Sequence, residues 1–255
     1  MNKFKSLVAG LALTGVAGSA SALGNFDTDI FNDANAVAQA KFDALSEDFG
    51  AALSYKAITP AEPLGLIGFD VGLEISGTQL EGVDEWGEAL DTDIGLLPLP
   101  KLHIHKGLPF GIDLGAVYSQ VPTTDIQYMG GEIRYSFISG NIAIPAIAVR
   151  GTYTQVIGID ELDFSTMGAE LTVSKGFLMA TPYAGIGQVW VNSKLDYSYE
   201  QSGVQVPVKL EASDDLSLFK YFIGLNFNLG LMNIVAEMDQ TGDAITYSGK
   251  LGFRF

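Results

Sequence analysis

Apolar residues recur at every second position along most of this chain, and this period constrains the fold more than any other feature. The last ten residues, TYSGKLGFRF, place Tyr247, Leu251, Phe253 and Phe255 on one parity and mostly small or charged residues on the other. Because a strand sends successive side chains to opposite faces, these residues predict a strand with one apolar and one polar face that runs to the last residue.

The same period and the turn residues between its runs predict about ten strands. The nine prolines agree, since all of them fall in expected turns or loops or near strand starts, where the missing N–H is tolerated. The expected strands are 64–78, 97–105, 110–119, 126–138, 145–156, 162–175, 181–193, 216–229, 231–239 and 244–255.

The composition is apolar, yet the chain lacks a spanning helix. Hydrophobic residues make up 47% of the sequence and charged residues 17%, and the mean hydropathy is +0.24. Beyond the N-terminus the longest apolar run, 142–149, is far shorter than the ~20 residues of a membrane helix, whereas strands of ~9–11 residues suffice to cross a bilayer. The absence of cysteine excludes disulfides and thiolate metal sites, and the formal charge of −16 argues against a nucleic-acid partner.

A soluble sandwich also alternates apolar and polar residues, so the two classes must be distinguished. Gly, Ser, Thr and Asn fill much of the polar parity here, where a solvated sheet would carry Lys and Glu. Short connections tend to alternate with long ones, which is typical of outer-membrane barrels and puts the last residue on the short-turn, periplasmic side. Aromatic residues near the expected strand ends fit the girdles of such barrels: Tyr118, Tyr128, Tyr135, Phe137, Tyr153, Tyr183, Tyr221, Phe227, Phe253 and Phe255. We therefore expect an all-β, antiparallel transmembrane β-barrel of about 10–12 strands with a short N-terminal helix.

The N-terminal region is expected to differ from the barrel at 59–255. Residues 1–22 are typical of a signal peptide, with Lys3 and Lys5 before an apolar stretch and a small-residue cleavage site at 20–22; a short buried helix is the alternative. Residues 23–58 are expected to form a helical, plug-like segment, with a helix at 31–47 and a candidate first strand at 49–58. That strand either lies outside the wall or pairs with an unrecognised strand to give twelve. The helix either plugs the lumen or rests at the periplasmic mouth.

The terminal KLGFRF resembles the C-terminal signature of bacterial outer-membrane β-barrels. The resemblance implies that Phe253 and Phe255 form a signal read by the barrel assembly machinery. It also implies a location in the outer membrane, in contact with lipid and lipopolysaccharide. The stretches LPKLHIHKGLPFGIDLGAVYS, SKGFLMATPYAGIG and GKLGFRF further resemble an uncharacterised family of proteobacterial exported barrels, and neither resemblance implies a substrate.

If the apolar parity faces lipid, the ionisable residues of the other parity face the lumen. Neighbouring strands tend to carry opposite charges, which predicts a network of cross-strand ion pairs in a mostly filled interior. A charge-lined selective pore is the alternative. The expected lumen residues are Asp70, Glu74, Lys101, His103, His105, Asp113, Glu132, Arg134, Arg150, Glu170, Lys220, Glu237, Asp239, Lys250 and Arg254.

Catalytic and metal chemistry have little support. The two histidines, His103 and His105, would point the same way on a strand and are expected to be lumen-facing polar residues near the periplasmic turn. Half of a zinc site with Asp113 as a third ligand is the alternative, but a fourth position is not identifiable. The carboxylate pairs have basic neighbours, which favours ion pairing over acid–base catalysis. The acidic residues at 81–93 form either a solvated loop or a site for cations that bridge to lipopolysaccharide. We expect no enzyme activity and no cofactor.

These observations predict an outer-membrane barrel that acts as a narrow channel or transporter for small solutes, apolar ones among them. The alternative is a structural or interaction barrel with a salt-bridged, filled lumen. The sequence alone leaves the substrate and the oligomeric state open.

Overall fold

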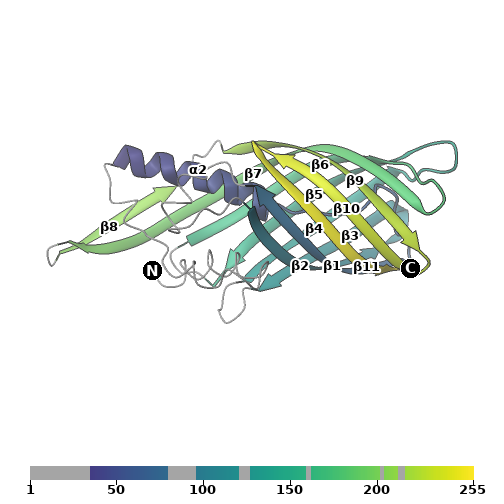
Figure 1. Ribbon diagram of the computed structural model, residues 1–255, viewed down its shortest axis with the longest axis horizontal. Coiled ribbons are helices and arrows are strands. Elements are labelled where there is room, and N and C mark those ends of the chain that lie inside the picture. Colours follow the sequence, from purple (N-terminus) through teal and green to yellow (C-terminus); the bar gives the residue numbers. More distant parts are fainter. Residues whose placement is uncertain (1–34, 80–95, 121–126, 159–161, 202–203, 212–215) are drawn as a thin grey trace.

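The computed structural model describes residues 35–79, 96–120, 127–158, 162–201, 204–211 and 216–255, which form an antiparallel barrel with one helix at its mouth (Figure 1). The signal peptide and the acidic loop at 81–93 lie outside these residues. The elements are α2 (Asn35–Leu53), β1 (Phe69–Gln79), β2 (Leu96–Gly107), the short 3-10 helix η2 (Pro109–Gly111), β3 (Ile112–Gln120), β4 (Gln127–Ile138), β5 (Ala146–Ile157), β6 (Leu162–Ser174), β7 (Ala180–Gln201), β8 (Val204–Glu211), β9 (Ser217–Leu229), β10 (Met232–Thr241) and β11 (Ala244–Arg254).

Ten strands close the barrel wall. Each strand from β1 to β7 pairs with the next, β7 pairs with β9, and β11 returns to pair with β1, so the ring has no free edge. The ten expected strands are thus confirmed. The bounds of most strands differ from the expected ones by a few residues. Tight turns join the strands at one end, where Gly230 takes a positive φ of 73° between β9 and β10.

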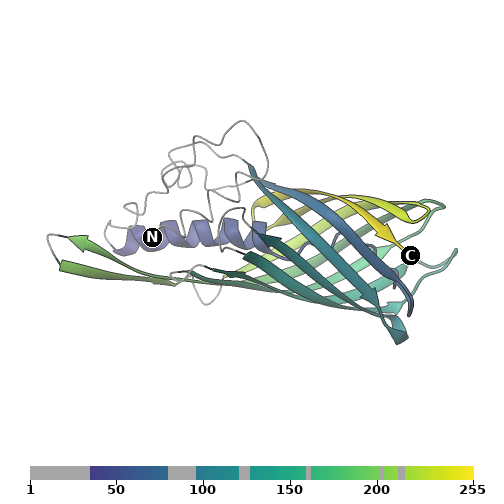
Figure 2. The ribbon, with the colours of Figure 1, turned by 90° about the horizontal axis from the view of Figure 1, so that it is seen from below.

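The eleventh strand, β8, was not expected. It pairs only with the part of β7 that begins at Lys194, where β7 leaves the wall. β7 is 22 residues long, and its last six residues extend about 20 Å past its pairing with β6. The hairpin of β7 and β8 therefore projects from the mouth of the barrel, beside α2 (Figures 1 and 2).

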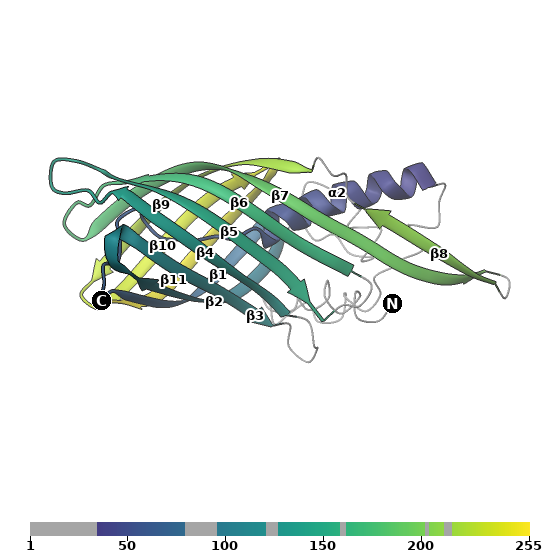
Figure 3. The ribbon, with the colours of Figure 1, turned by 180° about the vertical axis from the view of Figure 1, so that it is seen from behind.

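The two faces of the wall are chemically inverted relative to a soluble protein. On β1, Leu73 and Ile75 are 67% and 66% exposed on the outside, whereas Asp70 and Glu74 are 0% and 1% exposed on the inside. The other wall strands alternate in the same way. Figure 3 shows the strands of the wall from behind. An apolar outer face around a polar interior is the arrangement of a transmembrane β-barrel.

Exposed aromatic residues lie near both ends of this outer face, as expected for interfacial girdles. They include Tyr118, Tyr247 and Trp190 toward the hairpin end and Tyr135, Phe137, Phe227, Phe253 and Phe255 toward the C-terminal end. The prediction was wrong for Tyr128 and Tyr183, which are buried inside the barrel. A small neighbour makes room for the second: a Cβ at Gly224 would lie 2.2 Å from the Tyr183 ring.

Residues 49–58 do not form a wall strand. Helix α2 continues to Leu53, and the chain from 54 to 68 is neither helix nor strand. This stretch, called the lumen segment below, connects α2 to β1. Among the described residues, no helix has the length and apolar character needed to cross a membrane.

Helix α2 lies at the mouth opposite to the C-terminus, at the end from which the hairpin projects (Figures 1 and 2). It does not rest at the mouth where the chain ends, which was one of the two expected positions. Its last turns are buried: Phe49 meets Phe164 of β6 edge to face with ring centroids 6.0 Å apart.

Candidate functional site

The interior of the barrel holds the lumen segment, whose residues from 54 to 61 are all buried. Pro60 and Pro63 cannot donate backbone hydrogen bonds and disfavour helix in the residues before them, which keeps the chain extended after α2. Its carbonyl groups are therefore free to accept hydrogen bonds from wall side chains. Contacts of this kind occur along the whole segment.

Near α2 the segment is bonded to β9 and β10. Lys56 Nζ lies 2.7 Å from a carboxylate oxygen of Asp239, and it also donates to the Ala51 carbonyl oxygen at 2.8 Å. Lys220 Nζ donates to the Tyr55 carbonyl oxygen at 2.9 Å and pairs with Glu170 at 2.8 Å. Both lysines are buried, so each charge is neutralised within the lumen.

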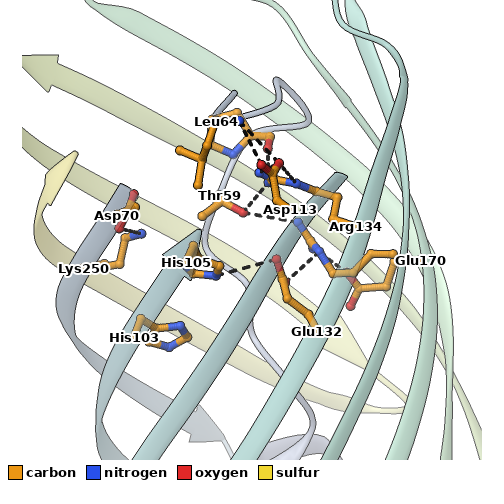
Figure 4. A network of polar contacts seen from close by, with 12 residues as sticks. Thr59, Leu64, Asp70, His103, His105, Asp113, Glu132, Arg134, Glu170 and Lys250 are labelled. Atoms are coloured by element: carbon orange, nitrogen blue, oxygen red, sulfur yellow. Dashed lines mark hydrogen bonds and ion pairs between the residues drawn. The ribbon is translucent and has the colours of Figure 1, made fainter. Parts of the chain in front are cut away.

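Halfway along, two arginines of the wall converge on Thr59 (Figure 4). Arg134 of β4 donates to the Thr59 hydroxyl at 2.8 Å and to the Pro60 carbonyl oxygen at 2.6 Å. Arg150 of β5 donates to the same hydroxyl at 3.3 Å. The guanidinium groups thus join the segment to the wall.

The same arginines also bind wall carboxylates. Arg134 pairs with Asp113 at 2.6 Å, and Arg150 pairs with Glu132 at 2.9 Å and with Glu170 at 2.7 Å. Each carboxylate comes from a neighbouring strand, and Glu170 also reaches Lys220 on β9, over Gly187 of the intervening strand β7. Ion pairs in which both partners keep several hydrogen bonds are the form in which buried charge is tolerated.

Toward the C-terminal end the segment is held by hydroxyl and carboxylate groups. Ser136 donates to the Ala61 carbonyl oxygen at 2.7 Å, and the Ala61 amide donates to Ser174 at 3.1 Å. The Leu64 amide donates to Asp113 at 3.1 Å (Figure 4). The backbone of the segment is therefore hydrogen-bonded to β3, β4 and β6 at this end.

Other charged residues pair within the wall. Glu74 of β1 contacts Lys101 at 3.2 Å and His103 at hydrogen-bond distance, both on β2. Lys250 of β11 pairs with Asp70 at 3.0 Å, across the seam that closes the barrel. These pairs link the first and last strands to their neighbours without involving the lumen segment.

The remaining predicted lumen residues are placed as follows. His105 Nε2 lies 3.7 Å from Glu132, and the Tyr183 hydroxyl donates to Glu237 at 2.7 Å. Arg254 is half-buried opposite Asp70 in the register of β1 and β11. All fifteen predicted residues thus lie on strands of the wall, and the structure brings most of them together in pairs.

The two histidines lie side by side on β2. The rings of His103 and His105 stack with centroids 5.7 Å apart. His103 faces Glu74 on the neighbouring strand β1, whereas His105 faces Glu132 on β4, over Gly115 of the intervening strand β3. Asp113, considered as a zinc ligand with them, is instead engaged by Arg134. In the described part of the chain, no three histidine, aspartate or glutamate side chains are grouped so that they could hold a metal ion.

Sequence reasoning missed the partners that the lumen segment supplies, namely Tyr55, Lys56 and Thr59. Two signals could have identified them. Lys56 is a single basic residue among small and apolar neighbours, and it needs a buried acidic partner. Gly115 interrupts the inner face of β3, and a Cβ there would lie 2.5 Å from His105, 2.6 Å from Glu132 and 2.8 Å from the Tyr55 hydroxyl, so this glycine makes room for Tyr55 together with two wall side chains.

Apolar residues on the inner parity near the hairpin end were also missed. They receive the last turns of α2: a Cβ at Gly50 would lie 2.5 Å from Val191 and 3.3 Å from Leu218. Phe164 belongs to the same group. These residues could have been identified because they are apolar and lie on the polar parity at a strand end. This pattern marks a place where the lumen is packed with apolar side chains.

No protein-family model and no curated protein matches the sequence. Solved structures that match it include the N-terminal β-barrel domain of Pseudomonas aeruginosa OprF, with 12% identity over 73% of this chain and 97% of that chain and a TM-score of 0.32. The translocator domain of the autotransporter NalP from Neisseria meningitidis matches with 12% identity over 90% and 99% and a TM-score of 0.40. The Ralstonia pickettii toluene transporter TbuX matches with 8% identity over 74% and 89% and a TM-score of 0.29.

The resemblance to an uncharacterised family of exported barrels stays a prediction. The closed ring, the apolar outer face and the polar interior are features of this chain itself. They make the protein a transmembrane β-barrel of the outer-membrane class.

Proposed function

We propose that this protein is an outer-membrane barrel that its own lumen segment keeps sealed, and that it anchors the structures at its hairpin end. The observation that carries the proposal is the row of contacts between segment and wall, from Lys56–Asp239 to Leu64–Asp113. A solute that crossed the barrel would have to displace a buried, hydrogen-bonded chain.

The size of the barrel supports a sealed lumen. An eight-stranded barrel is just filled by its own side chains, and ten strands leave slightly more room. The lumen segment fits such a space because Ser54, Ala57, Thr59 and Ala61 are small and are all buried. The long lumen side chains, such as Arg134, then fill the rest.

The role as an anchor is supported by what leaves the wall. The β7–β8 hairpin projects beyond the ring, and the first turns of α2 lie beside it at the same end (Figure 2). A barrel that only separates two compartments needs neither of them. We assign the function of binding or contacting other molecules to this end of the protein.

The location and the assembly route are part of the proposal. Phe253 and Phe255 are exposed on the outer face at the end of the closing strand, where the Phe255 amide donates to the Phe69 carbonyl oxygen at 3.0 Å. We propose that the barrel assembly machinery reads them there, after export directed by residues 1–22. Contact with lipopolysaccharide through the acidic loop at 81–93 belongs to the same proposal.

A gated channel is the second candidate, and one observation favours it. The segment is held mainly by polar bonds, which can exchange with water, and the wall behind it is polar. Release of the segment would therefore leave a hydrated passage. In this case the lumen segment is a gate for small solutes instead of a permanent seal.

Planar-bilayer recording of the purified protein tests the proposal. We expect no conductance from the unmodified protein and discrete conductance steps from a variant that lacks residues 35–64. Each sample is first checked for a folded barrel by comparing boiled and unboiled material on a gel. Steps from the unmodified protein would overturn the sealed state in favour of the channel, and a folded but silent deletion variant would show that the wall alone closes the lumen.

Fractionation tests the location. We expect the protein in the outer-membrane fraction, extractable only with detergent. Recovery of the processed protein in periplasmic extract without detergent would contradict the proposal, because the exposed apolar face could not remain in water.

A further inference from the structure

The two ends of the barrel differ, and they define the direction in which the lumen segment runs through it. The barrel has a short-turn end, where Phe69 begins β1 and Phe255 ends the chain, hydrogen-bonded to each other. It has a hairpin end, where β7 and β8 project. In barrels of this class the short turns face the periplasm and the longer loops face the outside.

The contacts of the lumen segment change in order from one end to the other. Tyr55 and Lys56 contact Lys220 and Asp239, which lie close to the hairpin end of β9 and β10. At the other extreme, the Gly68 carbonyl oxygen accepts from the amide of Gly107, the last residue of β2. Thr59, Ala61 and Leu64 contact the wall at successive levels between these points.

Helix α2 is fixed at the hairpin end by independent contacts. The Leu53 carbonyl oxygen accepts from Thr154 near the hairpin end of β5, and Phe49 packs on Phe164 near the start of β6. A Cβ at Gly242, in the turn between β10 and β11, would lie 2.7 Å from the Glu47 carboxylate. The helix is therefore a neighbour of two strand ends and one turn at the hairpin end of the barrel.

From this order we infer that the lumen segment spans the barrel between its periplasmic end, where β1 begins, and its outer end, so that α2 lies on the cell surface. The inference rests on the proposed location in the outer membrane. It adds a function to the sealed barrel: the barrel has moved α2 across the membrane and holds it at the cell surface.

Hydrogen bonds and ion pairs inside the lumen explain how the segment is held across the barrel. Lys56, Thr59 and Ala61 each find partners on the wall, so the segment needs no further protein to retain it. The apolar pocket around Phe49 and Phe164 then prevents α2 from sliding back toward the periplasm.

The absence of cysteine makes labelling of single introduced cysteines the direct test. Ala44→Cys places a thiol on the partly exposed face of α2, and Asp243→Cys places one in the exposed turn between β10 and β11 at the same end. Ile142→Cys places the control at the other end, in the β4–β5 connection, where the side chain is 99% exposed. Intact cells and lysed cells are treated with a membrane-impermeant maleimide.

We expect intact cells to label Ala44→Cys to the same extent as Asp243→Cys, and Ile142→Cys to be labelled only after lysis. Labelling of Asp243→Cys without Ala44→Cys in intact cells, when both are labelled after lysis, would overturn the inference and leave the proposed function intact. Labelling of none of the three before lysis and of all three afterwards would instead overturn the proposed location. Labelling of Ile142→Cys alone in intact cells would show an inverted barrel and overturn both.

A second measurement covers the case in which Ala44→Cys fails to fold. An epitope tag inserted directly before Asn35 in the full chain is detected by antibody on intact cells. We expect binding to intact cells, and binding only after lysis would overturn the inference.

Discussion

Removal of the Lys56 side chain should release the lumen segment from the wall in a larger fraction of molecules, and the structure indicates how large the increase should be. Lys56→Ala deletes three hydrogen bonds, to Ala51, Ser54 and Asp239, at 2.8, 3.0 and 2.7 Å. It leaves the carboxylate of Asp239 buried without its cation, although Thr241 still donates to it at 3.0 Å.

The cost can be estimated from this geometry. Breaking a buried ion pair by removing one partner costs about 3–5 kcal/mol, because the remaining charge is buried without compensation. The carboxylate regains water once the segment leaves the lumen, so the cost falls on the seated state. At the lower limit of about 3 kcal/mol, the released fraction should rise about 150-fold.

Thiol modification measures the released fraction. Ala57→Cys places a thiol in the middle of the segment, where the native side chain is 3% exposed, so a small thiol reagent reacts mainly after release. We expect the modification rate to rise about 150-fold when Lys56→Ala is added to this probe. The matched control is Lys250→Ala, which breaks a buried wall pair with Asp70 at 3.0 Å and does not touch the segment.

The control should change the modification rate little, even though it lowers the stability of the wall. Adding Asp239→Asn to Lys56→Ala should restore much of the protection, because no unpaired charge then remains. Equal rates for Lys56→Ala and Lys250→Ala would refute the reasoning, since the segment would then be held by the stability of the barrel and not by its own contacts.

Three further predictions concern the closing strand, the wall and the helix. Phe255→Ser should reduce the amount of heat-modifiable barrel in the outer membrane, whereas protein refolded in detergent should behave like wild type; an unchanged amount would argue against a terminal assembly signal. Gly224→Val should displace the ring of Tyr183, since a Cβ there would lie 2.2 Å from it, and should lower the free energy of unfolding in urea by about 1–3 kcal/mol; an unchanged urea midpoint would contradict the packing. Burial, followed by the nearby carboxylates of Asp243 and Asp48, raises the pKa of Glu47, so seating of α2 should tighten as the pH falls through that raised pKa and weaken as the pH rises through it. Glu47→Gln should remove this dependence from the thiol modification rate of Ala57→Cys, and a persisting dependence would assign it to another group.

The wall could be predicted from the sequence because its two faces meet solvents of opposite polarity. Alternation of residues such as Leu73 and Glu74 is enforced along every wall strand, and proline and glycine mark the turns. The ten strands and the orientation of the charged residues follow from this period alone.

The projecting hairpin could not be predicted in the same way. The residues of β8, VQVPVKLE, alternate like those of a wall strand. Pro207, which stands within this run and faces Ser198 in the register of β7 and β8, argued against a strand. Proline is tolerated there because β8 is an edge strand.

The path of the N-terminal region depends on contacts between distant residues. The order in which Lys56, Thr59 and Leu64 meet the wall is set by partners 49 to 183 positions away in the sequence. The buried position of Tyr183 has the same origin, since Gly224 on the neighbouring strand β9 leaves space for its ring. Aromatic residues at strand ends therefore identify a girdle only when the parity of the strand is taken into account.

The most direct measurement of the central claim, that the chain passes through its own barrel, is a disulfide between the segment and the wall. Ala61 packs against Ala148 of β5 inside the barrel, within one buried apolar cluster. Ala61→Cys with Ala148→Cys, the only two thiols in the chain, should form a disulfide in the folded protein, which is detected by mass spectrometry before and after reduction. Ala61→Cys paired with Thr246→Cys near the hairpin end of β11 should not form one. A folded barrel in which both thiols of the first pair stay free would contradict the account.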